Sequence, residues 1–512
     1  MSLFSMDVGQ TRLRLVQAGA VFFAVALVAG CGSNYRPVIT PIGPSGPAAQ
    51  PSGLAVVVSS PSPTASGVAT IIDYSGDTIM AQATIGPNPS SVSVDGNGST
   101  AYTVNSDGTL TNFPVSTALQ QKQISFSTLP VTARAVGLFA PTAGLWVSDL
   151  DGNAADVMTG YPASYKLAVP VAPTPIEIIG TSTIGQHNYA ISQNNSVTAP
   201  ASAIPYGVAC NLSPGTVTEN GEADSIETST NTVSARIPLG KCPVYAVAST
   251  DGKRVFVLNR GSDTVTVINS QNNDLDACTP FTNQNGRTVT CHPTLPLSTT
   301  AVSATGITPP NGVSGMSATA GPVYAEYNAA TSQLVVADYD GGTISVIDVS
   351  LDQYGDDSAT FGTTFTVPVG NSPASVTVLS DGSRAYSANQ ADGTVSIVNL
   401  SSHTLEKTLS VVGHPRTVAS TSNSLYGKVY VASPDSPYLT IIRTDQDSVG
   451  TTILVQGNIV DVRTSNQNGS RGNTVNVSRA PGAGQPCYLP PALMQSTYGA
   501  NYTLADCQTM PF

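Results

Sequence analysis

The sequence is poor in charged and aromatic residues. Charged side chains make up 10% of its 512 residues and aromatic ones 6%, with one tryptophan and four histidines. The chain has 20 Lys and Arg residues, spread thinly along its length, and 32 Asp and Glu residues, so the net charge is -12. A nucleic-acid interface needs a concentrated basic patch, and we therefore expect no nucleic-acid partner.

Motifs for common chemistries are missing as well. The chain has no GxSxG elbow, no phosphate-binding loop and no HExxH sequence, so acyl transfer, nucleotide binding and common zinc hydrolysis lack support. The histidines have no carboxylate or cysteine neighbour at a spacing typical of metal ligands. We expect no metal site and no cofactor, and the four dispersed positions are His187, His292, His403 and His414.

The first thirty residues have the features of an export signal. Two arginines precede an uncharged apolar run over residues 18–29, which is too short to span a bilayer comfortably as a helix. The run ends in Val28-Ala29-Gly30-Cys31, which resembles the lipobox of bacterial lipoproteins. This resemblance implies that residues 1–30 are removed and that the Cys31 thiol carries the lipid.

A short tether is expected after the lipid. Residues 31–52 contain Pro37, Pro41, Pro44 and Pro47 with small residues between them, the composition of an extended linker. Stable anchoring takes two or more acyl chains. No Asp follows Gly32-Ser33, which in the enterobacterial sorting rule indicates the outer membrane. We therefore expect a lipid-anchored protein of the cell envelope, on the periplasmic or surface side of the outer membrane.

Six further cysteines remain, an even number that suits disulfides in an exported chain better than a metal site. None forms a CxxC pair. Six cysteines permit fifteen connectivities, so pairing by proximity is only the simplest choice. That choice predicts the bridges Cys210–Cys242, Cys278–Cys291 and Cys487–Cys507.

A repeat dominates the rest of the chain. Its clearest copy has Gly370-x-x-Pro373, an alternating run, Asp381-Gly382, Ala385-Tyr386-Ser387-Ala388-Asn389 and a second alternating run from Gly393 to Asn399. Alternation of apolar and polar residues is the period of a strand, and Asp-Gly suits a tight hairpin. Similar copies begin at Gly240 and Gly86. Each copy predicts about four antiparallel strands, and the spacing of about 44 residues is typical of a propeller blade.

The repeat also predicts how the ring closes. An additional unit at Leu54-Ala55-Val56-Val57-Val58 opens the body without a first strand. The segment from Asn458 to Arg463 has the alternation of that missing strand. We therefore predict an all-β propeller of eight four-stranded antiparallel blades, with seven as the alternative, closed by this C-terminal strand. The predicted domains are a signal peptide (1–30), a tether (31–52), the propeller (53–463) and a disulfide-closed tail (464–512).

These units resemble the YVTN repeat family, whose name describes the second strand, here Tyr102-Thr103-Val104-Asn105. The better-known members have seven blades, so an eighth unit departs from that habit. Quinone-dependent dehydrogenase propellers repeat a tryptophan-docking motif, which a chain with only Trp146 cannot do. We expect Trp146 to pack in the core.

The expected function is non-catalytic binding or scaffolding of a protein or glycan partner. Two polar inserts interrupt the repeat, at residues 194–224 and roughly 270–315, and are candidate recognition loops. The turn from Asp149 to Asn153, with Asp156 beyond, loosely resembles the start of a calcium loop, but an Asx-stabilised hairpin is the better interpretation. The alternative function is a lactonase-like or lyase-like enzyme with scattered catalytic residues at the central channel.

Overall fold

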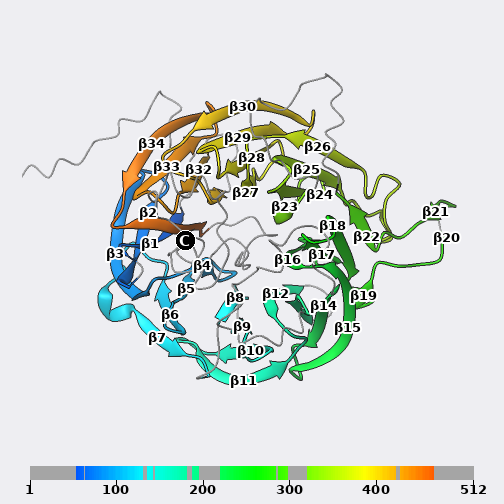
Figure 1. Ribbon diagram of the computed structural model, residues 1–512, viewed down its shortest axis with the longest axis horizontal. Helices are drawn as coiled ribbons and strands as arrows, with labels where there is room; N and C mark the ends of the chain where they lie inside the picture. The colour runs from blue at the N-terminus through cyan, green and yellow to red at the C-terminus, as the bar shows by residue number, and fades with distance from the viewer. Residues whose placement is uncertain are drawn as a thin grey trace, which may run out of the picture. The chain divides into compact units, whose positions relative to one another are not determined.

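The computed structural model describes residues 53–62, 64–130, 135–141, 144–181, 187–194, 220–283, 286–297, 320–421 and 427–465. All of them belong to one compact unit. Eight antiparallel sheets follow one another around a ring, which confirms the predicted eight-bladed propeller and removes the seven-bladed alternative (Figure 1).

Blade 1 joins both ends of the propeller. Its innermost strand β35 (Asn458–Thr464) pairs with β1 (Leu54–Ser60), which is followed by β2 (Ser66–Asp73) and β3 (Thr78–Pro87). The register places Val57 opposite Val462. Ring closure by the segment predicted from the sequence is therefore confirmed.

Blades 2 to 4 are built from consecutive strands, inner to outer. Blade 2 also carries a short 3-10 helix, η2 (Gln121–Gln123). The strands are β4 (Ser91–Val94), β5 (Thr100–Val104), β6 (Thr109–Pro114) and β7 (Ser125–Thr128) in blade 2; β8 (Ala135–Phe139), β9 (Leu145–Asp149), β10 (Ala154–Thr159) and β11 (Ser164–Pro170) in blade 3; and β12 (Pro175–Thr181), β13 (His187–Ser192), β14 (Asn220–Glu227) and β15 (Thr232–Lys241) in blade 4.

Blades 6 to 8 repeat this order. Their strands are β23 (Pro322–Asn328), β24 (Gln333–Asp338), β25 (Thr343–Asp348) and β26 (Thr364–Pro368) in blade 6; β27 (Pro373–Val378), β28 (Arg384–Asn389), β29 (Thr394–Asn399) and β30 (Thr404–Ser410) in blade 7; and β31 (Thr417–Ser420), β32 (Lys428–Ala432), β33 (Tyr438–Arg443) and β34 (Ser448–Leu454) in blade 8.

Blade 5 has a divided outer strand. Its inner strands are β16 (Pro243–Ala248), β17 (Arg254–Asn259) and β18 (Thr264–Asn269), and the outer edge of β18 pairs with both β19 (Asp274–Leu275) and β22 (Thr294–Pro296). A two-stranded sheet, β20 (Phe281–Thr282) with β21 (Thr288–Val289), lies between them in sequence. Part of the predicted 270–315 insert thus completes the blade.

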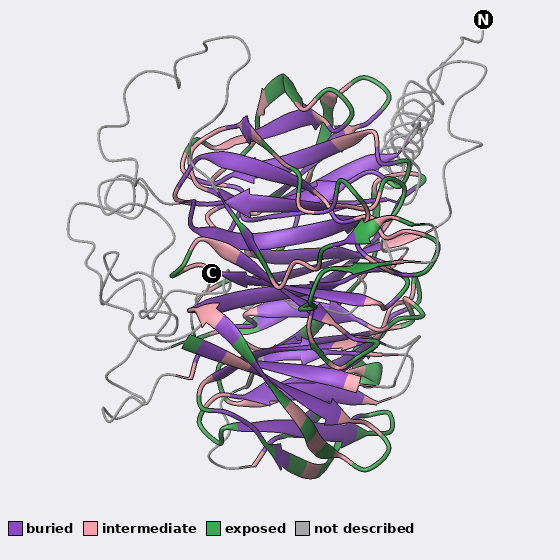
Figure 2. Ribbon diagram, turned by 90° about the vertical axis from the view of Figure 1, so that its right-hand side faces the viewer, coloured by how far each residue is buried: buried purple, intermediate pink, exposed green. Residues whose placement is uncertain are grey.

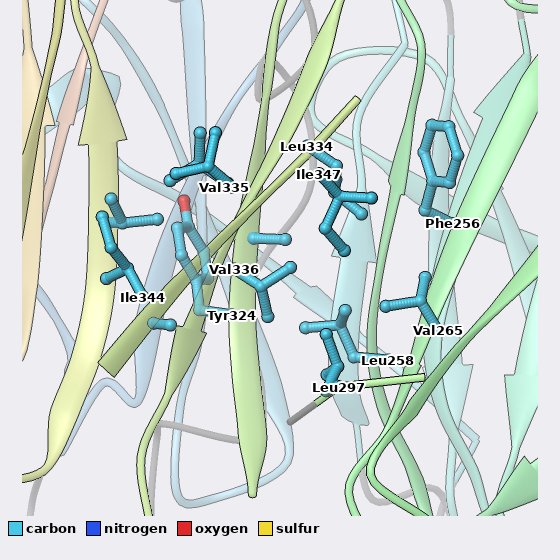
Figure 3. Close-up of a cluster of buried hydrophobic side chains, with 14 of the residues drawn as sticks. Phe256, Leu258, Val265, Leu297, Tyr324, Leu334, Val335, Val336, Ile344 and Ile347 are labelled. Carbon is cyan, nitrogen blue, oxygen red and sulfur yellow. The ribbon is translucent and has the colours of Figure 1, made fainter. Parts of the chain in front are cut away.

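The core lies between the blades. In Figure 3, side chains of blades 5 and 6 pack face to face, among them Phe256, Leu258, Leu334 and Ile347, none of which has measurable exposure. Burying one such side chain stabilises a fold by about 1.5–3 kcal/mol. Exposed residues gather in loops and on the outermost strands, such as β30 and β34 (Figure 2). Trp146 is 6% exposed, as its predicted core role requires.

An Asn at the end of the repeat's second strand links that strand to the third by side-chain hydrogen bonds. In three blades an Asn side chain there donates hydrogen bonds to two hydroxyl groups of the third strand. A Cβ on the preceding Gly370 would lie 2.6 Å from Nδ2 of Asn389, so the Gly of Gly-x-x-Pro makes room for this Asn. We call this arrangement the Asn clasp, and its donors are Asn105 to Thr109 and Thr111, Asn259 to Thr264 and Thr266, and Asn389 to Thr394 and Ser396.

The tyrosine of the same strand joins one blade to the next. The hydroxyl of Tyr386 donates to Asp447, and that of Tyr189 donates to Asn273 at 3.1 Å. Both acceptors lie at positive φ in a hairpin of the following blade. Contacts within and between blades therefore account for these three Asn and two Tyr side chains without a ligand.

Candidate functional site

Charged side chains on the innermost strands are the first candidates for a channel site. Glu177, Glu326, Asp461 and Arg463 lie on these strands and are at most 3% exposed. Oε2 of Glu177 accepts a hydrogen bond from the Ala246 backbone at 2.7 Å.

Blade 1 holds blade 2 in a similar way. Oδ2 of Asp461 accepts from the Val92 backbone at 3.1 Å, and Nε of Arg463 donates to the Val92 carbonyl at 3.2 Å. An inner strand has a strand neighbour on one side only, so its other backbone groups need partners from outside the blade. These buried charges supply such partners across blade boundaries.

The four predicted histidines lie in separate places. His187 starts β13 of blade 4, and His403 occupies a turn of blade 7 with its ring stacked on Phe365 at 3.8 Å between centroids. His414 precedes β31, where its Nδ1 lies 2.6 Å from Oδ2 of Asp435. His292 lies in blade 5, between β21 and β22. Within the described ranges the histidines do not converge on one site.

The calcium-like sequence forms a hairpin between β9 and β10. Oδ1 of Asp149 accepts a hydrogen bond from the Gly152 backbone at 2.9 Å, and Asn153 has positive φ, as in an Asx-stabilised turn. Asp156 is fully buried on β10, the third strand of blade 3. The equivalent positions of blades 2 and 7 are Thr111 and Ser396, which accept hydrogen bonds in the Asn clasp. Burial, followed by the charge of Asp149, raises the pKa of Asp156 to about 7.

The structure places two of the predicted disulfide residues together. Cys278 and Cys291 form a bridge with a Cα–Cα distance of 5.5 Å. Cys242 is also in a disulfide. Its predicted partner Cys210 lies outside the described residues, and so do Cys31, Cys487 and Cys507.

The Cys278–Cys291 bridge closes a projecting loop on blade 5. We call residues 276–283 and 286–293 the insert hairpin; it contains β20 and β21 and extends outward from the ring (Figure 1). Residues 277–282 are all exposed, and the Phe281 side chain is 41% exposed. The blade is complete without this segment, since β19 and β22 already cover the edge of β18.

Buried charges fix the base of the insert hairpin. Nη2 of Arg254, on β17, lies 3.1 Å from Oδ1 of Asp276 and 3.1 Å from Oδ1 of Asp357, which belongs to blade 6. Nδ1 of His292 lies 2.7 Å from Oδ2 of Asp357. Arg254, Asp276 and Asp357 are at most 2% exposed, whereas His292 is partly open. We call these four residues the insert anchor.

A second contact joins the insert hairpin to blade 6. We call residues 349–363, between β25 and β26, the blade 6 loop. Its Asp352 carboxylate accepts from Nδ2 of Asn283 at 2.9 Å and pairs with Nη2 of Arg287 at 2.8 Å. The backbone N–H of Tyr354 donates to the same carboxylate at 2.9 Å. Asp352 thereby holds the insert hairpin and the blade 6 loop together. Phe281 of the hairpin and Tyr354 of the loop are each 41% exposed.

Sequence reasoning singled out the insert but missed what holds it. Arg254 and Asp357 are 103 residues apart, and Arg287 and Asp352 are 65 apart. Nothing in the local pattern marks these residues as partners. The one available signal was the insert's excess length with its pair of cysteines.

No described helix is long and apolar enough to cross a membrane. No group of three or more His, Cys, Asp or Glu side chains in the same residues is arranged to hold a metal ion.

The fold is similar to that of solved proteins. Apo AztD from Citrobacter koseri matches with a TM-score of 0.51 at 10% identity, over 81% of this chain and 97% of that chain. A second AztD structure gives 0.51 at 9% identity, over 81% and 98%. A Bacteroides fragilis protein assigned as a 6-phosphogluconolactonase gives 0.45 at 13% identity, over 82% and 99%. No protein-family model and no curated protein sequence matches the chain. The likeness to AztD concerns the fold.

Proposed function

We propose that the chain is a lipid-anchored binding module of the cell envelope, and that the insert hairpin and the blade 6 loop form its recognition surface for a protein or glycan partner. The ordered state of the insert hairpin supports this proposal. A surface held in place before binding loses less conformational entropy when a partner arrives. A disulfide and the ion pairs Arg254–Asp276 and Arg287–Asp352 provide that order here.

The chemistry of the surface also suits binding. Phe281 and Tyr354 are exposed, each in a polar loop segment, and aromatic residues are enriched at binding interfaces. The enzyme alternative calls for His, Glu and Arg side chains grouped at the channel. In the ranges that the structure describes, the histidines are dispersed, and Glu177, Asp461 and Arg463 bond the neighbouring inner strand. No observation favours a lactonase-like or lyase-like function.

The binding surface is tested with the double substitution Phe281→Ser and Tyr354→Ser. We expect at least about a tenfold loss of affinity for isolated envelope protein or polysaccharide fractions, because truncating a hot-spot residue costs about 2 kcal/mol or more. The readout is the dissociation constant from co-sedimentation or biolayer interferometry. Phe126→Ser on β7, which removes an exposed ring from blade 2, is the matched control. An equal loss in this control, or no loss in the double variant, contradicts the assignment.

The anchor is tested separately with Cys31→Ser in the full-length chain. We expect loss of metabolically incorporated palmitate and release of the protein from the membrane pellet, because the thiol is the attachment point. Cys487→Ser, which removes another thiol of the chain, is the control and should keep the label. A membrane-bound, labelled Cys31→Ser protein rules out lipidation at this residue.

A further inference from the structure

The insert anchor holds two acidic side chains around one arginine in a buried place. Asp276 and Asp357 share Nη2 of Arg254, and Nδ2 of Asn269 donates to Asp276 at 3.0 Å. When both carboxylates are ionised, two negative charges face the single positive charge of Arg254. Burial of an uncompensated charge is costly, so binding one proton stabilises this arrangement.

The proton has a defined place. Oδ2 of Asp357 lies 2.7 Å from Nδ1 of His292, so a protonated Asp357 carboxyl can donate a hydrogen bond to the ring nitrogen. The nearby Arg287 is already paired, since its Nη2 donates to the Asp357 carbonyl and also pairs with the Asp352 carboxylate. Burial, and the neighbouring Asp276, raise the pKa of Asp357 to about 6, although His292 and Arg254 oppose the rise.

We infer that docking of the insert hairpin onto blade 6 takes up one proton at Asp357, so that mild acid fixes the recognition surface and higher pH loosens it. The inference rests on the proposed function only where it says that this surface recognises a partner. The contacts of the anchor stand without it.

The direction follows from the two states. When the hairpin lifts away, Asp357 meets water and returns toward the ordinary aspartate range near about pH 4. The pKa of Asp357 is higher with the hairpin docked than with the hairpin lifted away. Its full contribution to docking is therefore present at pH values below the lower of these two pKa values. That contribution declines as pH rises from about 4 and is lost above about 6. Docking should thus weaken up to about tenfold for each pH unit within this window.

The test is hydrogen–deuterium exchange of the lipid-free, disulfide-intact protein at several pH values from 4.5 to 7.5, corrected for intrinsic exchange rates. We expect the protection of peptides covering residues 277–292 to fall at least about tenfold across this range. Asp357→Asn, which is neutral at every pH, should remove the slope. Asp352→Asn, the matched control from the same loop, should keep it. Peptides from blade 7 report whether each variant is folded.

Unchanged protection of the hairpin across the range in the wild-type protein overturns the inference. A slope that survives in Asp357→Asn does the same. Should Asp357→Asn fail to fold, His292→Gln takes its place, and it should alter the midpoint of the wild-type slope. Exchange is measured without a partner, so the two proposals can fail separately. A pH-dependent hairpin that binds nothing refutes only the proposed function, and a pH-independent hairpin that binds a partner refutes only the proton-dependent docking.

Discussion

A chain that ends after Leu454 is expected not to form a stable ring. It lacks β35, whose Ile459, Val460 and Val462 side chains are fully buried. At about 1.5–3 kcal/mol for each side chain, their loss removes roughly 5–9 kcal/mol, which is comparable to the whole stability of a typical domain. The hydrogen bond from Oγ1 of Thr464 to the Ser420 carbonyl, which joins blade 8 to blade 1, disappears as well.

Thermal unfolding followed by near-ultraviolet circular dichroism measures this effect. The control chain ends after Ser465, whose backbone donates to the Leu54 carbonyl at 2.8 Å, and it keeps the complete blade 1. Val462→Asp in the full-length chain separates loss of the strand from loss of the residues beyond it. A cooperative transition at the control's temperature in the shorter chain would show that β35 does not hold the ring.

Asp338→Asn should make the protein more stable in alkali. Asp338 takes the clasp position of blade 6, where Oδ2 accepts from the hydroxyl groups of Thr343 at 3.1 Å and Ser345 at 2.7 Å. Burial raises the pKa of Asp338 to about 8, although these two bonds oppose the rise. Its contribution to stability is therefore complete below about pH 4 and is lost as pH rises through about 8.

The amide group that Asp338→Asn introduces is uncharged at every pH and matches the Asn clasp of the other blades. We expect the variant to be more stable than wild type by at least about 2 kcal/mol at pH 9, with little difference at pH 4, because one pH unit of pKa difference corresponds to about 1.4 kcal/mol. Urea unfolding at pH 4, 7 and 9 gives the comparison.

The reciprocal change, Asn389→Asp in blade 7, should introduce the pH dependence that Asp338→Asn removes. It places a carboxyl group beside Thr394 and Ser396, in the same arrangement of hydroxyl groups. If the free energy of unfolding changes with pH in the same way in wild type and Asp338→Asn between pH 4 and 9, Asp338 does not titrate in this range.

The fold could be predicted from patterns among residues that are close together in the sequence. Alternation and turn residues set the strands, and the unpaired alternating segment at Asn458 set the closure. One predicted disulfide, Cys278–Cys291, is confirmed because the two residues are close in sequence and lie in the same insert. These are features that neighbouring residues determine.

Contacts between blades could not be predicted in the same way. The partners of Arg254 depend on how blade 6 is placed beside blade 5, and no periodicity encodes that. The split outer strand of blade 5 was missed for a related reason. Each of its pieces, Asp274–Leu275 and Thr294–Pro296, is too short to show alternation.

The pairing of β1 with β35 also sets an order of events in folding. The backbone N–H of Leu54 is bonded to the hydroxyl of Ser465, 411 residues away. Blade 1 consequently stays three-stranded until nearly the whole propeller has been synthesised, and contacts between such distant residues form slowly. During that interval the edge of β1 can pair with strands of other chains. The finished ring hides this edge, so the newly made chain is most prone to aggregation just before closure.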